Sequence, residues 1–499
     1  MDTTLRDGEQ TSGVSFSLQE KMSIAHLMLI DLGVDRVEIA SARVSKGEYT
    51  SVSKILDWAK SVGCLHRIEI LGFVDNGASL QWINEVGCKT INLLTKGSYK
   101  HVTEQLKKTP EQHLEAIKRE IAIAESLGIS VNIYLEDWSN GMRHSEDYVY
   151  FLVDNLKDLP IKRFMLPDTL GIMSPRTSYE ACRKMIERYP DLHFDFHAHN
   201  DYDLAVANVM SAVEAGVRGV HVTMNGLGER AGNATVSSVV AMLHDHLKVK
   251  TNIDETKLNR VSRVVETYSG LNIASNQPIV GENVFTQTAG IHADGDNKNN
   301  LYFNELFPER FGRVREYALG KLSGKANIRK NIEALGIELS EEDMTKVTNK
   351  VIELGDKKEI ITQEDLPYII SDVLHNGEKE AKIKILAFTF VLSKGLRPTA
   401  TVRIDINGKE YEETAPGDGQ YHAFTKALWK IYNKLNKATP ALTNYAVVIP
   451  PGGRTDALVQ TVISWSFSGK NFKTRGLDAD QTEAAVKATE KMLNIIEDM

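Results

Sequence analysis

The sequence has few of the features that mark secreted, membrane or nucleic-acid-binding proteins. Its three cysteines in 499 residues, Cys64, Cys88 and Cys182, lie far apart without a CxxC pair, which argues against a disulfide scaffold. No apolar run approaches the ~18 residues of a membrane span, and the first residues are not those of a signal peptide. With 59 Lys and Arg against 67 Asp and Glu, no basic nucleic-acid footprint is expected. We expect a cytoplasmic protein without nucleic-acid or membrane partners.

A strand–helix alternation fills the first half of the chain. Hydrophobic residues make up 42% and charged residues 25%, as in globular proteins, and the length allows two to four domains. Short strand-like runs lie at 34–40, 67–73, 90–95, 130–136, 161–168, 193–200 and 219–226. With a strand leading into residues 2–7 they would make eight, which predicts a (β/α)₈ barrel; a doubly wound open sheet is the alternative. Either the start codon is assigned too late or the first strand is very short.

The alternation of strands and helices stops near residue 265, and the composition predicts that the chain has three parts. Residues 1–265 form the barrel, and residues 266–380 form a connector that is irregular at first and then helical, with two small subdomains. Residues 381–499 repeat strands followed by a helix, which predicts a pseudo-twofold α+β regulatory domain. The fold class is therefore α/β, a TIM barrel with a connector and a C-terminal α+β domain.

The strongest chemical signal is HFDFHAHN, the run at 193–200. Side chains two apart on a strand share a face, so His197 and His199 point together at the carboxyl end of a barrel strand. In isolation such a pair is more often two unrelated histidines. Asp7, in LRDGEQ, ends the first strand, and only the eighth strand separates it from the histidine strand.

One aspartate and two histidines form an open three-ligand set for a divalent ion. Zn²⁺, Mn²⁺, Mg²⁺, Fe²⁺ and Co²⁺ fit such mixed nitrogen and oxygen ligands about equally well. Arg6, next to Asp7, is better placed to stabilise a carbonyl oxygen that gains negative charge than to form a surface ion pair. Polar residues end other strands too, among them Glu136 and Thr169. The glycines and Asn233 of GLGERAGN indicate either backbone near a ligand or a tight turn.

Three motifs together, DTTLRDGEQ, HFDFHAHND and GLGERAGN, resemble the metal-dependent barrel enzymes that condense acetyl-CoA with 2-oxo acids. This family includes the 2-isopropylmalate, homocitrate and citramalate synthases, and hydroxymethylglutaryl-CoA lyases share its barrel. The similarity continues through QTAGIHADGDNKNNLY and PPGGRTDALV. The C-terminal domain resembles the synthases' amino-acid-binding regulatory domain, which the lyases lack.

The resemblance implies a role for each matching residue. Asp7, His197 and His199 match the metal ligands, and Asn233 lies near the ion. Arg6 matches the residue that stabilises the enolate and alkoxide oxygens. Glu136 and Thr169 match contacts to the 2-oxo acid. His292 and Tyr302 match connector residues that enter the partner subunit's site, which implies a homodimer with a composite active site.

The choice of 2-oxo acid depends on three expected pocket residues, Leu71, Leu94 and Tyr134. All are bulky and largely apolar, so they leave room for little more than a methyl group, which favours pyruvate. YLEDWSNG and LLTKGS also resemble the pyruvate-specific members of the family. The alternative is 2-oxoisovalerate, with Leu71 and Leu94 merely packing the barrel.

The pyruvate route leads to isoleucine, so the C-terminal domain is expected to bind isoleucine, with leucine as the alternative. Tyr421 and Tyr445 lie where the family's effector pocket would be, but His422 replaces an expected acidic residue. A purely structural dimerisation role for this domain and a catalytically inactive amino-acid sensor are the other interpretations.

Overall fold

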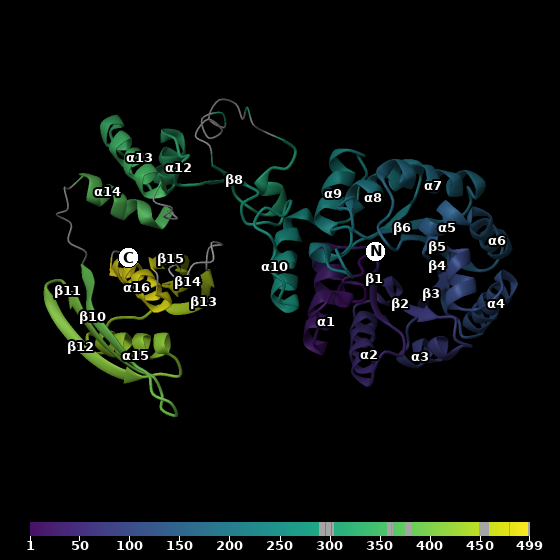
Figure 1. Ribbon diagram of the computed structural model, residues 1–499, viewed down its shortest axis with the longest axis horizontal. Helices are drawn as coiled ribbons and strands as arrows, with labels where there is room; N and C mark the ends of the chain where they lie inside the picture. Colours follow the sequence, from purple (N-terminus) through teal and green to yellow (C-terminus); the bar gives the residue numbers. More distant parts are fainter. Residues whose placement is uncertain are drawn as a thin grey trace. The chain divides into compact units, whose positions relative to one another are not determined.

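The computed structural model describes residues 1–288, 295, 301, 304–356, 361, 363–374, 382–448, 459–478 and 480–497. The chain divides into two compact units, which we describe separately (Figure 1). The barrel unit comprises Met1–Phe285 and Asn304–Arg315, and the second unit comprises Thr286–Phe303 and Glu316–Met499.

The barrel unit is built on seven parallel strands that are neighbours in chain order. The strands are β1 (Val37–Ser41), β2 (Ile68–Phe73), β3 (Thr90–Lys96), β4 (Ser130–Glu136), β5 (Ile161–Asp168), β6 (Phe194–Ala198) and β7 (Gly219–His221). All seven runs expected from the sequence are confirmed as strands. A doubly wound sheet would reverse its strand order at a switch point, so the consecutive order excludes that alternative.

The eighth position of the ring is filled by Asp2 alone. Its backbone forms parallel bridges to Val37 of β1 on one side and to Val222, just after β7, on the other. The Asp2 N–H donates to the Arg36 carbonyl at 2.8 Å, and the Thr3 N–H donates to the Val222 carbonyl at 2.8 Å. These bridges at Asp2 link the two edges of the seven-stranded sheet.

Helices surround the strands, as expected from the alternation of strand and helix (Figure 1). They are α1 (Leu18–His26), α2 (Lys46–Ser61), α3 (Ala78–Val86), α4 (Pro110–Ser126), α5 (Trp138–His144), α6 (Glu146–Leu156), α7 (Pro175–Arg188), α8 (Ala205–Ala215), α9 (Val236–Asp245) and α10 (Leu258–Ser269). Ser17, Thr109 and Ser174 begin α1, α4 and α7 with capping boxes, which satisfy backbone N–H groups that the first turn leaves free.

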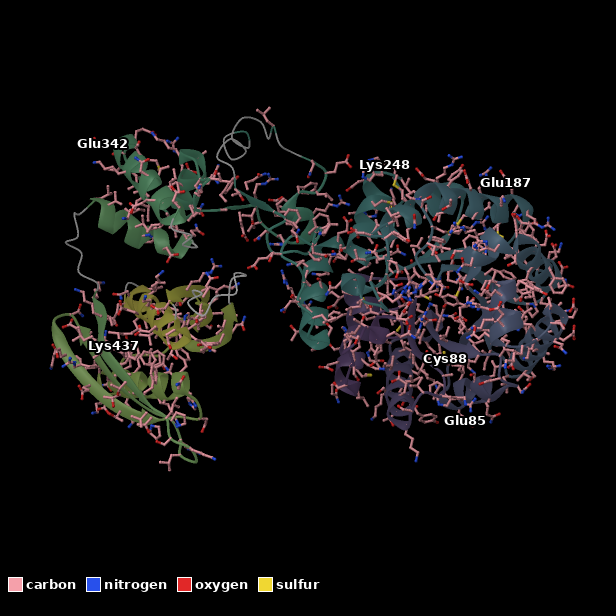
Figure 2. All side chains as sticks on the ribbon, viewed as in Figure 1. Glu85, Cys88, Glu187, Lys248, Glu342 and Lys437 are labelled. Carbon is pink, nitrogen blue, oxygen red and sulfur yellow. The ribbon has the colours of Figure 1, made fainter. Side chains whose placement is uncertain are left out.

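The barrel unit contains a large cluster of buried apolar side chains, and charged side chains such as Glu187 and Lys248 lie on its surface (Figure 2). Cys64, Cys88 and Cys182 are buried and unpaired, consistent with the expected absence of a disulfide scaffold. Within the described part of the chain, no helix combines the length and the hydrophobicity needed to cross a bilayer.

Part of the expected connector packs on the barrel unit. Arg310 forms ion pairs with Asp245 at 2.7 Å and with Glu255 at 2.6 Å, which attaches Asn304–Arg315 to the end of α9 and the turn before α10. Residues 266–285 also belong to the barrel unit, and the remaining described connector residues belong to the second unit. It contains the short strands β8 (Thr286–Gln287) and β9 (Glu316–Tyr317) and the helices α12 (Lys325–Ala334), α13 (Glu341–Asp356) and α14 (Leu366–Leu374).

The C-terminal part contains the expected duplication, with two three-stranded antiparallel sheets, each followed by a helix. The first set is β10 (Ile383–Val391), β11 (Thr399–Ile406), β12 (Lys409–Pro416) and α15 (Gln420–Lys434); the second is β13 (Ala441–Val448), β14 (Val459–Phe467), β15 (Lys470–Asp478) and α16 (Gln481–Glu497). Both sets contribute to one apolar core, which includes Phe424, Trp465 and Met492.

The sequence pattern missed β15, because Lys470–Asp478 contains few apolar residues. The internal repeat could have revealed it. The two-residue turn Ser468–Gly469 before β15 occupies the same place in the second set as Asn407–Gly408, before β12, does in the first.

Candidate metal centre

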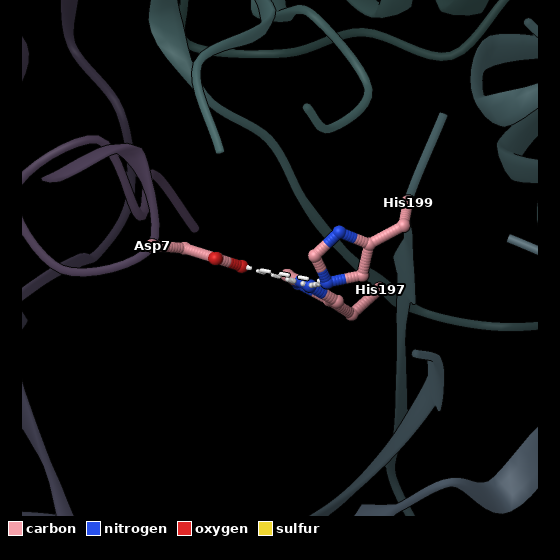
Figure 3. Close-up of side chains that lie close together, drawn as sticks. All are labelled: Asp7, His197 and His199. Carbon is pink, nitrogen blue, oxygen red and sulfur yellow. Dashed lines mark hydrogen bonds and ion pairs between the residues drawn. The ribbon is translucent and has the colours of Figure 1, made fainter. Parts of the chain in front are cut away.

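Three ligand-type side chains from distant parts of the barrel unit meet in one buried cluster, Asp7, His197 and His199 (Figure 3). Asp7 comes soon after Asp2, and its N–H donates to the Thr3 carbonyl at 2.8 Å. His197 lies on β6, and His199 follows the end of that strand. Because β7 alone lies between β6 and the Asp2 position, barrel closure brings the three side chains together.

The distances in this cluster suit a single shared ion. Nε2 of His197 lies 3.0 Å and Nε2 of His199 lies 3.9 Å from Oδ2 of Asp7, and the two Nε2 atoms are 3.3 Å apart. One ligand atom from each residue lies within 4.8 Å of the others, and all three side chains are buried. Two nitrogens and a carboxylate are a mixed donor set for a divalent cation.

Unpaired polar atoms around the cluster support this fit. Oδ1 of Asp7 has no hydrogen-bond partner, and the buried Oδ1 of Asn233 has none either. The backbone of Asn233 pairs with that of His199, so the amide belongs to the same corner of the barrel. Because buried oxygens without partners are costly, this corner favours a cation that would satisfy them. The buried group is consistent with a divalent metal site.

The protonation states of Asp7 and His199 also favour metal binding. Burial by itself raises the pKa of Asp7, but the Arg6 guanidinium and the two imidazoles outweigh it and hold that pKa well below its usual range. Burial, with help from His197, lowers the pKa of His199 to about 4. An ionised carboxylate and a neutral imidazole are the protonation states that bind metals.

Arg6 is held in place beside the cluster. Its Nε donates to Oε2 of Glu38 at 2.5 Å, and its Nη1 lies 3.6 Å from Oδ2 of Asp7. The guanidinium carbon lies 5.8 Å from the centre of the Tyr134 ring. Since the Arg6 side chain is only 9% exposed, a surface ion pair does not describe it.

Glu136 and Thr169 stand at the ends of neighbouring strands, as expected, but their side chains bind other groups. Glu136 forms an ion pair with Lys96. The hydroxyl of Thr169 accepts a hydrogen bond from the Asp137 N–H at 2.9 Å. Neither interaction involves Asp7, His197 or His199.

The three expected pocket residues do lie together. Leu71 and Tyr134 form a small buried cluster with Met1 and Met165, and Leu94 packs against it. Leu94, Tyr134 and Met165 occupy paired positions on β3, β4 and β5, so they form a row across the sheet. The rings of Tyr134 and His197 are T-shaped to each other, with centres 5.8 Å apart, which places this apolar cluster next to the candidate metal ligands.

The glycines of the GLGERAGN loop pack against the loop itself. A Cβ on Gly232 would lie 1.9 Å from the Gly226 carbonyl oxygen, and a Cβ on Gly228 would lie 2.1 Å from Nδ2 of Asn233. Both glycines also have a positive φ. Of the two readings of this motif, the structure supports the tight turn, whose effect is to place Asn233 beside His199.

His292 and Tyr302 lie outside the described residues. In the second unit, Tyr421 of α15 and Tyr445 of β13 do lie together, with ring centres 5.1 Å apart. The Tyr421 hydroxyl is 2.7 Å from the hydroxyl of Thr489 on α16. His422 is turned to its own helix end, where its Nδ1 accepts the Asp418 N–H at 3.2 Å.

Sequence reasoning missed four residues around the site: Glu38, Lys96, Met165 and His221. Each lies beside a residue with an expected role in the site. Glu38 bonds Arg6, Lys96 pairs with Glu136, and Met165 and His221 both lie beside Tyr134. Glu38 on β1 and His221 on β7 are buried polar residues within strands. Polar residues inside otherwise apolar strands were the available signal, although their partners depend on the three-dimensional pairing.

Three family models match successive parts of the chain. Residues 1–265 match the HMGL-like family, residues 279–359 match the homocitrate synthase post-HMGL domain-like family, and residues 360–497 match the LeuA allosteric (dimerisation) domain. The chain is 34% identical over 497 residues to the (R)-citramalate synthase CimA of Methanocaldococcus jannaschii, covering 99% of this chain and 98% of that one.

Two 2-isopropylmalate synthases are almost as similar. The Methanocaldococcus jannaschii enzyme is 32% identical over 504 residues, with 99% of this chain and 94% of that one covered. The Pyrococcus abyssi enzyme is 32% identical over 498 residues, with 97% and 98% covered. Overall identity therefore does not separate the two activities.

Proposed function

This chain belongs to the HMGL-like family, and we propose that within it the chain is an (R)-citramalate synthase, which condenses acetyl-CoA with pyruvate and hydrolyses the thioester to citramalate and CoA. The chain is an acyltransferase of the 2-isopropylmalate/citramalate synthase family, whose members carry out a Claisen condensation. Its LeuA allosteric domain implies a homodimer that is regulated by an effector.

The observation that carries the choice of pyruvate is the row of Leu94, Tyr134 and Met165 beside His197. Together with Leu71 these side chains narrow the space next to the metal ligands. Pyruvate presents only a methyl group beyond its ketone, whereas 2-oxoisovalerate presents an isopropyl group. A packed pocket rejects added bulk through overlap, so pyruvate is the better fit.

The chain's own residues suit the condensation. When bound at Asp7, His197 and His199, a divalent ion supplies Lewis-acid polarisation of the ketone of a 2-oxo acid. Arg6, fixed by Glu38, holds a positive charge where the enolate and alkoxide oxygens develop negative charge. Glu136 and Thr169, at the ends of β4 and β5, contact the 2-oxo acid in this proposal, while His292 and Tyr302 of the partner subunit assist proton transfer and thioester hydrolysis.

The second candidate is 2-isopropylmalate synthase, because synthases of that kind align with nearly the whole chain at 32% identity. It would use 2-oxoisovalerate and respond to leucine, whereas the pyruvate enzyme would respond to isoleucine bound near Tyr421 and Tyr445. An inactive amino-acid sensor is less consistent with the chain, because Arg6, Asp7, His197 and His199 are all present and lie together.

The deciding experiment measures CoA release from acetyl-CoA with pyruvate, 2-oxobutanoate, 2-oxoisovalerate and 2-oxoglutarate at equal concentrations. Each reaction is run with Mg²⁺, Mn²⁺ or Zn²⁺, and with or without isoleucine and leucine. The proposal expects the fastest release with pyruvate and inhibition by isoleucine. Faster release with 2-oxoisovalerate would establish the second candidate, and a metal-loaded protein that turns over none of the four would support the sensor.

A further inference from the structure

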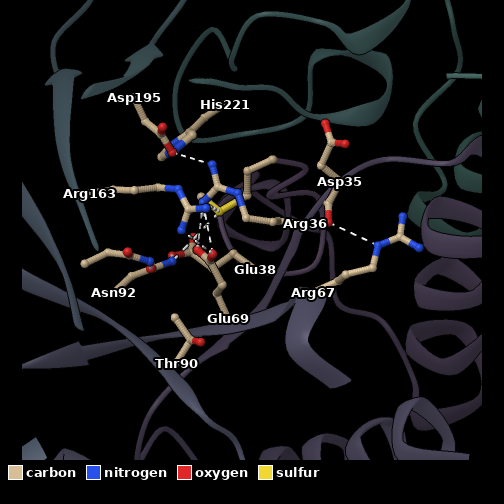
Figure 4. Close-up of polar contacts among 12 residues, drawn as sticks. Asp35, Arg36, Glu38, Arg67, Glu69, Thr90, Asn92, Arg163, Asp195 and His221 are labelled. Carbon is tan, nitrogen blue, oxygen red and sulfur yellow. Dashed lines mark hydrogen bonds and ion pairs between the residues drawn. The ribbon is translucent and has the colours of Figure 1, made fainter. Parts of the chain in front are cut away.

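A chain of hydrogen bonds crosses the barrel interior below the metal centre. The Tyr134 hydroxyl lies 3.0 Å from Nδ1 of His221, and Nε2 of His221 lies 3.1 Å from Oδ2 of Asp195. All three side chains are buried. The chain continues through the ion pair between Asp195 and Arg36 to Glu69, which lies 3.0 Å from Arg36 (Figure 4).

The Asp195 end of this chain is held independently of His221. Arg36 pairs with Oδ2 of Asp195, and Nε2 of His193 lies 2.9 Å from its Oδ1. An ionised carboxylate has no proton to donate, so Asp195 accepts the Nε2–H of His221. Nδ1 of the neutral ring is then the acceptor, and the Tyr134 hydroxyl donates to it. The network therefore assigns the tautomer of His221 and the direction of the Tyr134 O–H bond.

Tyr134 connects this network to the site. Its ring packs against the ring of His197 and lies near the Arg6 guanidinium. The same ring forms a wall of the apolar cluster with Leu71 and Met165. A rotation of the Tyr134 ring would change the space next to the metal ligands, so whatever fixes this ring also fixes the pocket.

Packing alone gives no reason for the His221–Asp195 pair. Buried ionic and polar pairs are often no more stabilising than apolar residues of similar volume, and the same barrel interior also buries Glu69, Asn92 and Asn132. A fully satisfied buried network does, however, restrict its members to one arrangement. That restriction is the property that a pocket wall requires.

We propose that His221 is a positioning residue that determines specificity: by bridging Asp195 and the Tyr134 hydroxyl, it fixes the Tyr134 ring as the wall that admits pyruvate and rejects larger 2-oxo acids. The substrate named here rests on the proposed function, whereas the bridge itself does not. His221 touches no reacting atom. Its ring also lies against that of His197, with centres 5.5 Å apart, so the double variant is needed to separate its action through Tyr134 from this second contact.

The test compares three single variants and one double variant. His221→Leu removes both hydrogen bonds at similar volume, whereas His221→Gln retains one donor and one acceptor. Tyr134→Phe removes the hydroxyl alone, and Tyr134→Phe/His221→Leu completes the cycle. For each we measure kcat and KM with pyruvate and with 2-oxobutanoate. The ¹³Cζ resonance of tyrosine-labelled protein is recorded as well, with the Tyr134 signal identified by its loss in Tyr134→Phe.

The proposal expects His221→Leu to raise the KM for pyruvate about five- to tenfold, the size of one lost hydrogen bond. The preference for pyruvate over 2-oxobutanoate should fall by a similar factor, the Tyr134 resonance should move, and His221→Gln should restore most of each effect. The double variant should be no worse than Tyr134→Phe.

Two results would overturn the proposal. One is that the effects of His221→Leu and Tyr134→Phe on KM and selectivity multiply in the double variant, and the other is that the Tyr134 resonance does not move in His221→Leu. If His221→Leu does not fold, His221→Gln and Tyr134→Phe still decide the question, because an identical KM and selectivity in Tyr134→Phe would exclude any action through the hydroxyl. A wild-type protein that releases no CoA from any 2-oxo acid would refute the proposed function, and the resonance would then decide the bridge alone.

Discussion

Oδ2 of Asp7 lies 3.0 Å from Nε2 of His197, although the two residues are far apart in the sequence. Asp7 comes soon after Asp2 and His197 belongs to β6, so the contact exists only because the ring closes through Asp2. The candidate metal centre therefore depends on the closure of the barrel, and a change that opens the ring at Asp2 should also separate Asp7 from the two histidines.

Replacing His197 should remove metal binding and activity together. His197→Ala deletes one of the three ligands of the buried cluster, and the two that remain are a poor set for a divalent ion. We expect bound metal to fall from one ion per chain to near zero after gel filtration, measured by elemental analysis. His144→Ala, at an exposed position at the end of α5, is the matched control and should keep its metal. Full metal content in His197→Ala would exclude His197 as a ligand.

Replacing Arg6 by lysine should reduce turnover but not metal binding. Lysine keeps the charge but cannot place one nitrogen on Glu38 and another toward Asp7, as the planar guanidinium does. We expect kcat to fall about 10²-fold or more, with metal affinity within a fewfold of wild type. Arg43→Lys, in an exposed ion pair with Asp75, is the control. A wild-type kcat in Arg6→Lys would show that the guanidinium geometry is not needed.

Shortening Leu71 should widen the pocket. Leu71→Ala removes a branched side chain from the cluster around Tyr134, and one methylene in such a pocket changes discrimination by about 1–3 kcal/mol. The ratio of kcat/KM for 2-oxobutanoate to that for pyruvate should rise at least tenfold. Leu152→Ala, in the buried face of α6, should lower stability without changing this ratio. An unchanged ratio in Leu71→Ala would mean that the pocket lies elsewhere.

His113 should make the barrel sensitive to acid. It is buried, its Nε2 accepts the Lys96 N–H at 3.1 Å, and burial, aided by Lys108 and Lys96, lowers its pKa from 6.5 to about 4. The unfolded chain therefore binds a proton that the folded chain does not. Stability is full above about pH 6.5 and is lost as the pH falls toward 4, by about 2 kcal/mol near pH 5.

Urea unfolding of wild type and His113→Gln at pH 7 and pH 5 measures this term, since the glutamine retains an acceptor but does not titrate. The fall in the free energy of unfolding between the two pH values should be smaller in His113→Gln. An equal fall in both proteins would assign the acid sensitivity to other groups.

Tyr421 should be needed for feedback inhibition. Its ring lies against Tyr445, and its hydroxyl is close to that of Thr489 on α16, so the three define a polar corner between two helices and a strand. Tyr421→Ala should raise the isoleucine concentration for half-inhibition at least tenfold. Tyr411→Ala, on β12, is the control. Unaltered inhibition in Tyr421→Ala would place the effector elsewhere.

The barrel strands and the clustering of Asp7, His197 and His199 could be predicted largely from local rules. Alternating apolar runs mark strands, and residues two apart on a strand share a face, which was enough to pair His197 with His199. Predicting that Asp7 lies beside the two histidines also required the assumption that the strands close into a barrel. The partners of these residues were not predictable: Glu38 beside Arg6 and His221 beside Tyr134 come from other strands, and only the register of the folded sheet brings them together.

The central claim is that Asp7, His197 and His199 hold one divalent ion in the barrel. Crystals grown with Mn²⁺ or Zn²⁺ and measured at the absorption edge of the metal test it directly. The account predicts one strong anomalous peak per chain, about 2.0–2.3 Å from Nε2 of both histidines and from an Asp7 carboxylate oxygen. A peak bound by other residues, or none at this cluster at saturating metal, would contradict it.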